Sequence, residues 1–197
     1  MINFIKRVTL FVIASNTSNK LEFRATVLNS ENPRRELIEK AVNSELKKIT
    51  KSQRLSRLTR EFFLNAAVDG DAASYSFWED SPEGGLIRTE LISNTQIYFG
   101  NSASYDVQPQ PFIIIERLEE TKNLKERARL NGEENYSDIV PEPEYKNSVA
   151  PKTRVLLKLF KKDGEVYAAE CTKDVFVRRP WRWGSGAIPF PICRGTT

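Results

Sequence analysis

The first third of the chain has the hydrophobic pattern of helices. Residues 2–17 are mostly apolar, which predicts a buried amphipathic helix. Apolar residues then recur every three or four positions from residue 37 to residue 66. This spacing predicts a long helical region that begins at Pro33, after Asn32 as its cap, and ends near Gly70. The pattern leaves open whether that helix is continuous across Thr50 to Ser52.

Strand-like patterns occupy most of the remaining chain. Strict alternation of apolar and polar residues predicts a strand at residues 21–28. After residue 72, short apolar runs bounded by turn residues predict a sheet, with one helix at residues 118–130 and a loop at residues 133–152. The strands predicted in this sheet are residues 73–79, 86–92, 95–99, 111–117, 153–160, 165–171 and 174–179.

Together these elements predict an α+β fold, in which N-terminal helices pack on a mostly antiparallel sheet with one inserted helix. Residues 73–92 are expected to form one hairpin. A second hairpin is expected around Asp163-Gly164, because Asp-Gly is a favoured pair in tight turns. Trp78 lies on a strand that alternates like a core strand, so we expect its indole in the core.

The composition excludes several kinds of chemistry. The chain contains no histidine, which removes the commonest general base and the commonest metal ligand. It therefore has no Ser-His-Asp or Cys-His arrangement of its own. Cys171 and Cys193 are too few for a zinc site or a disulfide scaffold and are typical of a reducing compartment. We expect no catalytic residue, no metal and no cofactor, and thus a protein that is not an enzyme.

Two groups of acidic residues have the carboxylates that a divalent metal site needs, but neither has the spacing of a known metal-binding loop. The groups are Glu79, Asp80 and Glu83 at a turn, and Glu116, Glu119 and Glu120 near the start of the predicted helix. Negative charge at a helix start is favourable without any metal. Residues 100–104 lack the Gly-Lys-Ser/Thr sequence of a phosphate-binding loop.

The apolar run at residues 8–14 is not expected to enter a membrane. It is far shorter than the roughly 20 residues that span a bilayer. A signal peptide would place its charges before the apolar region, whereas Lys6 and Arg7 lie within it, and Ala14-Ser15-Asn16 is a poor cleavage site.

The strongest charge pattern lies between residues 34 and 60, where nine cations accompany three acids. Arg54, Arg57 and Arg60 recur every third residue, so we expect them to share one helix face. Two interpretations stay open: a solvated basic face, or a surface that meets a phosphate backbone or an acidic partner. The candidate contacts to DNA or to another subunit are Arg54, Arg57, Arg60, Lys47, Lys48 and Lys51.

The most specific pattern is residues 91–118, LISNTQIYFGNSASYDVQPQPFIIIERL. A strand leads to Phe99-Gly100-Asn101, then to Asp106-Val107-Gln108 and Gln110-Pro111, and then to an apolar strand. In this order the segment resembles the portal proteins of certain tailed phages and prophages. The flanks at residues 65–78 and 155–181 are similar to the same family, so the likeness extends over residues 2–181 and is softer in the first 60.

The resemblance implies a structural subunit of the phage portal ring, through which double-stranded DNA is packaged and ejected. The implied partners are other portal subunits in a dodecamer, the major capsid and scaffold proteins, the terminase and the head–tail adaptor. Double-stranded DNA would be contacted without sequence specificity. The implied location is the portal vertex of the virion, and the host cytoplasm during assembly.

The resemblance also divides the chain. Residues 1–181 correspond to a wing-like α+β domain, whereas residues 182–197 do not match the family and are expected to be a frameshifted or disordered tail. Family members are usually several hundred residues long, so we expect this chain to be an N-terminal wing-region fragment. The alternative is a small basic nucleic-acid-binding module.

Overall fold

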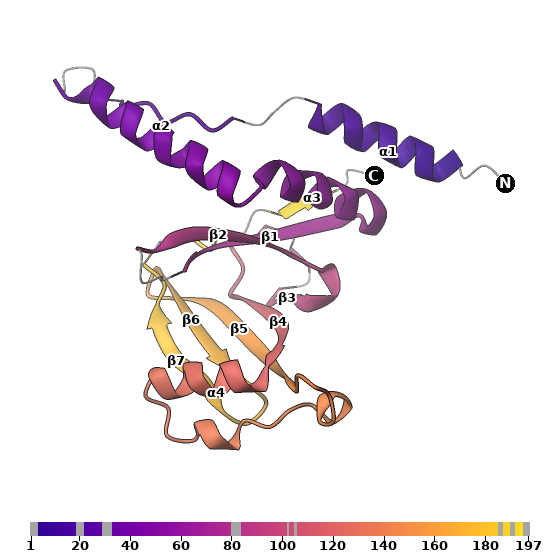
Figure 1. Ribbon diagram of the computed structural model, residues 1–197, viewed down its shortest axis with the longest axis vertical. Coiled ribbons are helices and arrows are strands. Elements are labelled where there is room, and N and C mark those ends of the chain that lie inside the picture. Colours follow the sequence, from indigo (N-terminus) through magenta and orange to yellow (C-terminus); the bar gives the residue numbers. More distant parts are fainter. Residues whose placement is uncertain are drawn as a thin grey trace. The chain divides into compact units, whose positions relative to one another are not determined.

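The computed structural model describes residues 4–18, 22–28, 33–79, 84–101, 103–104, 106–184, 187–189 and 192–194. Within them the chain forms four α-helices and two antiparallel sheets, which confirms the α+β fold class (Figure 1). The helices are α1 (Phe4–Thr17), α2 (Arg35–Ser52), α3 (Leu55–Asp69) and α4 (Thr121–Leu130). The strands are β1 (Asp71–Glu79), β2 (Leu86–Ile92), β3 (Ile97–Phe99), β4 (Phe112–Glu120), β5 (Lys152–Lys162), β6 (Glu165–Cys171), β7 (Phe176–Arg182) and β8 (Ile192–Arg194). Short 3-10 helices lie at Asn94–Gln96, Tyr136–Asp138 and Pro143–Tyr145.

The chain divides into two compact units. The first unit comprises residues 1–91 and 190–197, and the second unit comprises residues 92–189. The boundary lies inside residues 1–181, the region that the resemblance treats as one domain. The helices α1 to α3 belong to the first unit, and the inserted helix α4 belongs to the second.

The first unit combines three helices with a three-stranded sheet in the order β2-β1-β8. The helix predicted at residues 2–17 is confirmed for its described part, α1, which lies against α3. The expected burial of this helix is wrong, because Ile13 is the single side chain described as buried within it, and Phe4 and Phe11 are each 74% exposed. β1 and β2 are neighbours, as the predicted hairpin requires, and its turn at residues 80–83 lies outside the described residues. The tail contributes β8, which pairs antiparallel with β1 and places Arg194 opposite Asp71.

The predicted long helical region consists of two helices. α2 ends at Ser52, and Arg54 adopts a left-handed φ of 50° before α3 begins. The backbone N–H of Thr89 donates to Gln53 Oε1 over 2.8 Å, which ties this break to β2. The start of α2 falls at Arg35, two residues after Pro33, and the predicted cap Asn32 lies outside the described residues.

The strand predicted at residues 21–28 is wrong for the described residues 22–28, which lie along α2 without joining a sheet (Figure 1). The Asn43 side chain accepts the Ala25 N–H and donates to the Ala25 carbonyl, both over 2.9 Å. Glu39 Oε1 accepts the Val27 N–H over 2.8 Å. Side chains of a helix therefore satisfy backbone groups that a neighbouring strand would otherwise bind.

A five-stranded antiparallel sheet, in the order β3-β4-β5-β6-β7, forms most of the second unit. The predicted hairpin of β5 and β6 is confirmed. Its turn residues Asp163 and Gly164 both have positive φ, 53° and 78°, as a tight hairpin turn requires.

One face of this sheet, here called the core face, holds the buried residues of the unit. Leu124 and Ala128 of α4 pack in one buried cluster with Val155 and Val177, so α4 covers part of this face (Figure 1). The central residues of the core face are at most 3% exposed; they are Ile113, Ile115, Leu157, Leu159 and Val166.

Two further predictions differ from the structure. The helix predicted at residues 118–130 begins only at Thr121, because residues 118–120 continue β4 and pair with β5.

Trp78 is 61% exposed, so its predicted place in the core is wrong. The buried part of β1 is residues 72–75, at the other end of the strand, and alternation alone does not distinguish the two ends. Trp78 lies instead against Gly85, where an added Cβ would be 2.1 Å from the indole.

Candidate functional site

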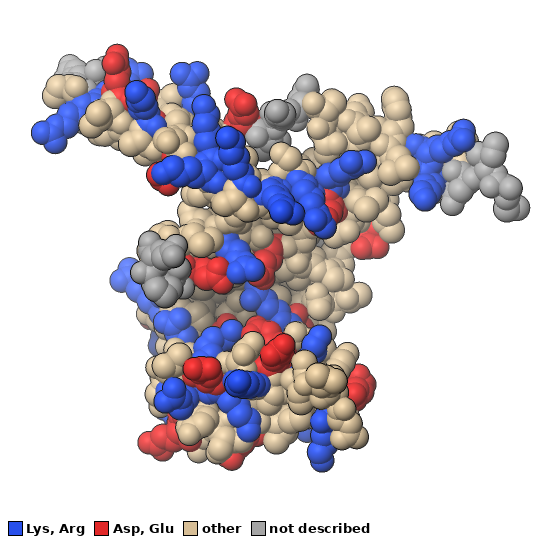
Figure 2. Space-filling model, in the orientation of Figure 1, with Lys and Arg blue, Asp and Glu red and all other residues tan. Residues whose placement is uncertain are grey.

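The basic residues of the first unit lie on α2, on the break that follows it and on the first turns of α3. Lys40, Lys47 and Lys51 are seven and four residues apart, so they share one face of α2. All three are exposed. In Figure 2, Lys and Arg side chains gather along α2 and α3 on the face in view.

Arg54 does not belong to the face that carries Arg57 and Arg60. It lies in the left-handed break before α3, whereas the other two arginines lie within the helix. The prediction that all three share one helix face is therefore wrong. Its physical cause is the interruption of the helix at residues 53 and 54, which the hydrophobic spacing did not reveal.

Some of the cations in this region already have carboxylate partners three or four residues away. The hydrogen bond that Arg57 donates to Glu61 raises the pKa of the Arg57 guanidinium. Such pairs leave little net charge for an external ligand. The pairs are Arg35–Glu39, Lys48–Glu45 and Arg57–Glu61, with N···O distances of 3.0, 2.6 and 2.8 Å.

Five other cations form no ion pair with any carboxylate in the described part of the chain. They are exposed, and we call them the basic surface: Lys40, Lys47, Lys51, Arg54 and Arg60. Exposed cations without carboxylate partners attract polyanions, because each can neutralise a phosphate or a carboxylate of the ligand. The predicted contacts Lys47, Lys51, Arg54 and Arg60 belong to it, and Lys48 and Arg57 do not.

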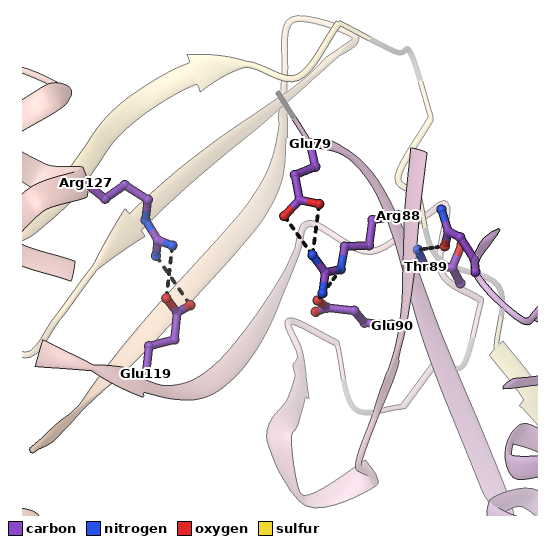
Figure 3. Close-up of polar contacts among 7 residues, drawn as sticks. Glu79, Arg88, Thr89, Glu90, Glu119 and Arg127 are labelled. Atoms are coloured by element: carbon purple, nitrogen blue, oxygen red, sulfur yellow. Dashed lines mark hydrogen bonds and ion pairs between the residues drawn. The ribbon is translucent and has the colours of Figure 1, made fainter. Parts of the chain in front are cut away.

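The charged residues at the β1–β2 hairpin are paired with one another. Figure 3 shows Arg88 between Glu79 and Glu90. Arg88 Nη1 lies 2.8 and 2.9 Å from the two carboxylate oxygens of Glu79, and Arg88 Nε lies 3.5 Å from Glu90. The hydrogen bond to Glu79 raises the pKa of the Arg88 guanidinium. Asp80 and Glu83 of the same acidic group lie outside the described residues.

Two of the three residues in the second acidic group, Glu116 and Glu119, also form ion pairs, and Glu120 is exposed. Glu116 lies 3.2 Å from Arg154, and Glu119 lies 3.0 Å from Arg127 (Figure 3). Within the described residues, no three potential ligands come close enough together to hold a metal ion.

Arg127 joins two carboxylates in the second unit. It comes from α4 and contacts Glu119 of β4 and also Glu170 of β6, the latter over 3.4 Å. Burial raises the pKa of the Glu170 carboxyl, and the attraction of Arg127 opposes this rise. Glu170 is far from the other two residues in sequence, and the spacing of the three carries no signal that predicts the group.

One buried glutamine closes the loop in the segment that resembles portal proteins. Gln110 is 1% exposed. Its Oε1 accepts the Asn101 N–H over 2.8 Å, and its Nε2 donates to the carbonyls of Asn101 and Ser104 over 3.2 and 2.7 Å. The side chain thus satisfies backbone groups that lie outside any sheet. Phe99 ends β3, and Asp106 is exposed.

Two more matching residues have geometric roles in the same loop. The Gly100 N–H donates to the Phe112 carbonyl over 2.9 Å, and an added Cβ at Gly100 would lie 2.8 Å from Pro111 Cγ. The close approach therefore requires glycine. The Gln108 side-chain amide donates to the Ile188 carbonyl over 2.9 Å and accepts the Ile188 N–H over 3.2 Å.

No protein-family model matches this chain, and no curated protein sequence matches it. Among the described helices, none combines the length and the apolar character needed to cross a bilayer. The likeness of residues 91–118 to portal proteins therefore remains a resemblance, and the loop geometry gives the roles of these residues in this chain.

Reasoning from sequence located the basic region but did not include Lys40 among its candidate contacts. Lys40 lies seven residues before Lys47, and this spacing was the available signal for its place on the same face. The role of Gln110 had no such signal, because nothing in a lone glutamine indicates that it is buried.

Proposed function

We propose that this chain is the wing region of a structural subunit of a phage portal ring. The observation that carries the proposal is the resemblance of residues 91–118 to portal proteins. It gains support from the roles of the matching residues, since Gln110 closes the loop on Asn101 and Gly100 permits the approach to Pro111. A likeness that includes residues on which a loop depends is more specific than one made of surface residues alone.

In this proposal the subunit has no catalytic role. It assembles with other portal subunits, the major capsid and scaffold proteins, the terminase and the head–tail adaptor. Double-stranded DNA passes through the ring without base readout, so contacts to the phosphate backbone suffice. A ring closes when two different surfaces of each subunit meet head to tail.

Electron microscopy tests the proposal. The open reading frame that encodes this chain, expressed to its natural end and viewed in negative stain, should yield closed rings of uniform subunit number. A monodisperse monomer of that same product, confirmed by light scattering at the concentrations used for microscopy, would contradict the portal assignment.

A second candidate function is a small basic nucleic-acid-binding module, and the basic surface is the observation that favours it. Its five cations lack carboxylate partners among the described residues, so each is available to a phosphate. Binding of this kind depends on charge and is independent of base sequence.

A salt titration of duplex binding measures how many of these cations act. Neutralising five phosphates predicts that log K falls with log salt with a slope of about −4.5. Replacing Lys47 and Lys51 by alanine should reduce that slope by about 2. The matched control replaces Lys48 and Arg57, which carry the same charge but are already paired with Glu45 and Glu61. Equal effects of the two double variants would contradict a role for the basic surface.

A further inference from the structure

The five-stranded sheet of the second unit has a second face, opposite the core face. Alternation places Phe112 of β4 on it, and the strand register pairs Phe112 with Phe160 of β5 and Phe160 with Tyr167 of β6. An aromatic row therefore crosses three neighbouring strands. We call this face the outer face. Its centre consists of Tyr98, Phe112, Ile114, Leu156, Lys158, Phe160, Tyr167, Ala169 and Cys171. The same register places charged residues around this centre: Glu116, Glu120, Lys152, Arg154, Lys162, Glu165 and Arg182.

The outer face remains partly accessible, in contrast to the core face. Phe112, Phe160 and Tyr167 are half-buried, and Tyr98 and Lys158 are exposed. α4 lies on the opposite side, where its buried residues pack in the core cluster. An antiparallel sheet usually carries polar residues on a solvated face. An apolar and aromatic centre in such a face is instead typical of a surface that binds another protein.

Several charges on the outer face have partners within it, among them Arg182, which forms an ion pair with Glu165. Lys158 Nζ lies 4.8 Å from the centre of the Phe112 ring and 5.6 Å from that of Phe160. Glu116, on the same face, is paired with Arg154. A nucleic acid or a charged peptide would require unpaired charges here. The centre of the face is complementary to an apolar and uncharged surface.

α1 presents such a surface. Phe4, Val8 and Phe11 recur at four- and three-residue spacing, so they form one stripe along the helix. They are 74, 46 and 74% exposed, whereas Ile13, on the other side of the helix, is 2% exposed. The more apolar side of α1 thus faces outward, which reverses the usual arrangement of a surface helix. The stripe contains no charged residue.

We propose that the α1 stripe of one copy of this chain docks on the outer face of the sheet in the next copy. The inference rests on the proposed function, because a ring needs two different surfaces that meet head to tail. The dimensions agree: Phe4 to Phe11 spans about 10 Å along a helix. The aromatic row spans about 10 Å across three strands. A helix laid on the open face of a sheet buries both apolar surfaces.

Cys171 provides a native position for crosslinking, since its register opposite Leu156 places it on the outer face. With Cys193→Ser as the background, Phe11→Cys introduces a second thiol within the stripe. Treatment with a short bismaleimide should link each copy to two neighbours. A denaturing gel should then show a ladder of dimers, trimers and larger products, because head-to-tail contacts propagate.

The matched control is Asn16→Cys in the same background, which places the thiol on α1 at an exposed position outside the stripe. The ladder should fall at least several-fold in this control and should disappear when Cys171→Ser is added to Phe11→Cys. Dimers that persist without Cys171 would indicate pairing of two α1 helices and would overturn the proposal. A crosslink within one copy, an equal ladder from Asn16→Cys, or monomers alone would overturn it as well.

Electron microscopy tests the portal assignment independently of the α1 contact. Closed rings of the unmodified protein together with an absent ladder would overturn the α1 contact and leave the portal assignment in place. Absence of both rings and ladder would overturn both.

Discussion

The two compact units bury their apolar residues to very different degrees. The central residues of the core face in the second unit are almost fully buried, and α4 adds Leu124 and Ala128 to them. In the first unit, neither α2 nor α3 contains a buried residue, and Leu37 and Val68 are largely exposed. Because burial of apolar surface is the main favourable term in folding, the second unit has the better means to fold by itself.

This difference in burial also separates the residues that stabilise the fold from the residues that are exposed to a binding partner. The first unit carries its cations and several large apolar side chains on its outside, where they add little to its own stability. Exposed apolar groups of this extent indicate a surface that another molecule covers. We therefore expect substitutions in the second unit to act on folding, and those in the first unit to act mainly on binding and local order.

The largest expected effect is that of Leu159→Ala in the core face. Leu159 is fully buried, and its truncation leaves a cavity that should lower the free energy of unfolding by about 2–5 kcal/mol. The matched variant in the first unit is Leu37→Ala on α2, at a position 70% exposed, where we expect a change within about 0.5 kcal/mol. Urea unfolding measures both.

Tryptophan fluorescence can follow the two units separately. The second unit contains Trp181 and Trp183, and the first unit contains Trp78. The variant Trp78→Phe reports unfolding of the second unit alone, and the double variant at positions 181 and 183 reports the first. Similar losses from the two leucine variants would contradict the distinction between the units.

Sequence reasoning succeeded best where local pattern and final packing agree. Alternation and the Asp163-Gly164 turn predicted β5 and β6, because a sheet face and a tight turn depend on adjacent residues. The segment 22–28 alternates equally well, but Asn43 and Glu39 take the place of a partner strand. Such long-range side-chain bonds have no periodicity that could be recognised beforehand.

The candidate site was predictable in part for the same reason. Charge density located Lys47 and Lys51, since it is read directly from composition along the chain. Pairing with carboxylates and the left-handed break at Arg54 depend on three-dimensional geometry. The pairing and the break determine which cations are available to a ligand. An arginine at positive φ is uncommon, and no sequence rule predicts it.

Gln110→Ala should have the next largest effect, again in the second unit. It removes one acceptor and two donors from the loop that resembles portal proteins. The Asn101 N–H and the Ser104 carbonyl lose their hydrogen bonds to Gln110, whereas the Asn101 carbonyl still accepts the Ser104 N–H. We expect a loss of about 2 kcal/mol in the free energy of unfolding. The control is Gln96→Ala, at an exposed position, with an effect within about 0.5 kcal/mol. Equal effects would show that the loop does not depend on Gln110.

Asn43→Ala tests local order in the first unit and should have a smaller effect. The substitution removes both hydrogen bonds that hold Ala25, so residues 22–28 should separate from α2 while the rest of the unit stays folded. Hydrogen exchange of the Ala25 amide should become faster by an order of magnitude or more. Ser44→Ala, at the adjacent exposed position, should leave that rate unchanged. Unchanged exchange in Asn43→Ala would mean that other contacts hold the segment.

The smallest effect concerns the pH dependence of the second unit. The folded state raises the pKa of Glu170 above 4.5, because burial disfavours its charged form more than Arg127 favours it. Folded protein thus binds the proton more tightly than unfolded protein does, and the contribution of Glu170 to stability falls as pH rises from 4.5 through the raised pKa.

Glu170→Gln, which cannot ionise, should match the wild type near pH 4.5 and be slightly more stable than it near neutral pH. Thermal unfolding across this range measures the difference, and Glu134→Gln at an exposed position reports the effect of removing a carboxylate in general. If Glu170→Gln were instead the less stable protein at neutral pH, the ion pair with Arg127 would outweigh the cost of burial.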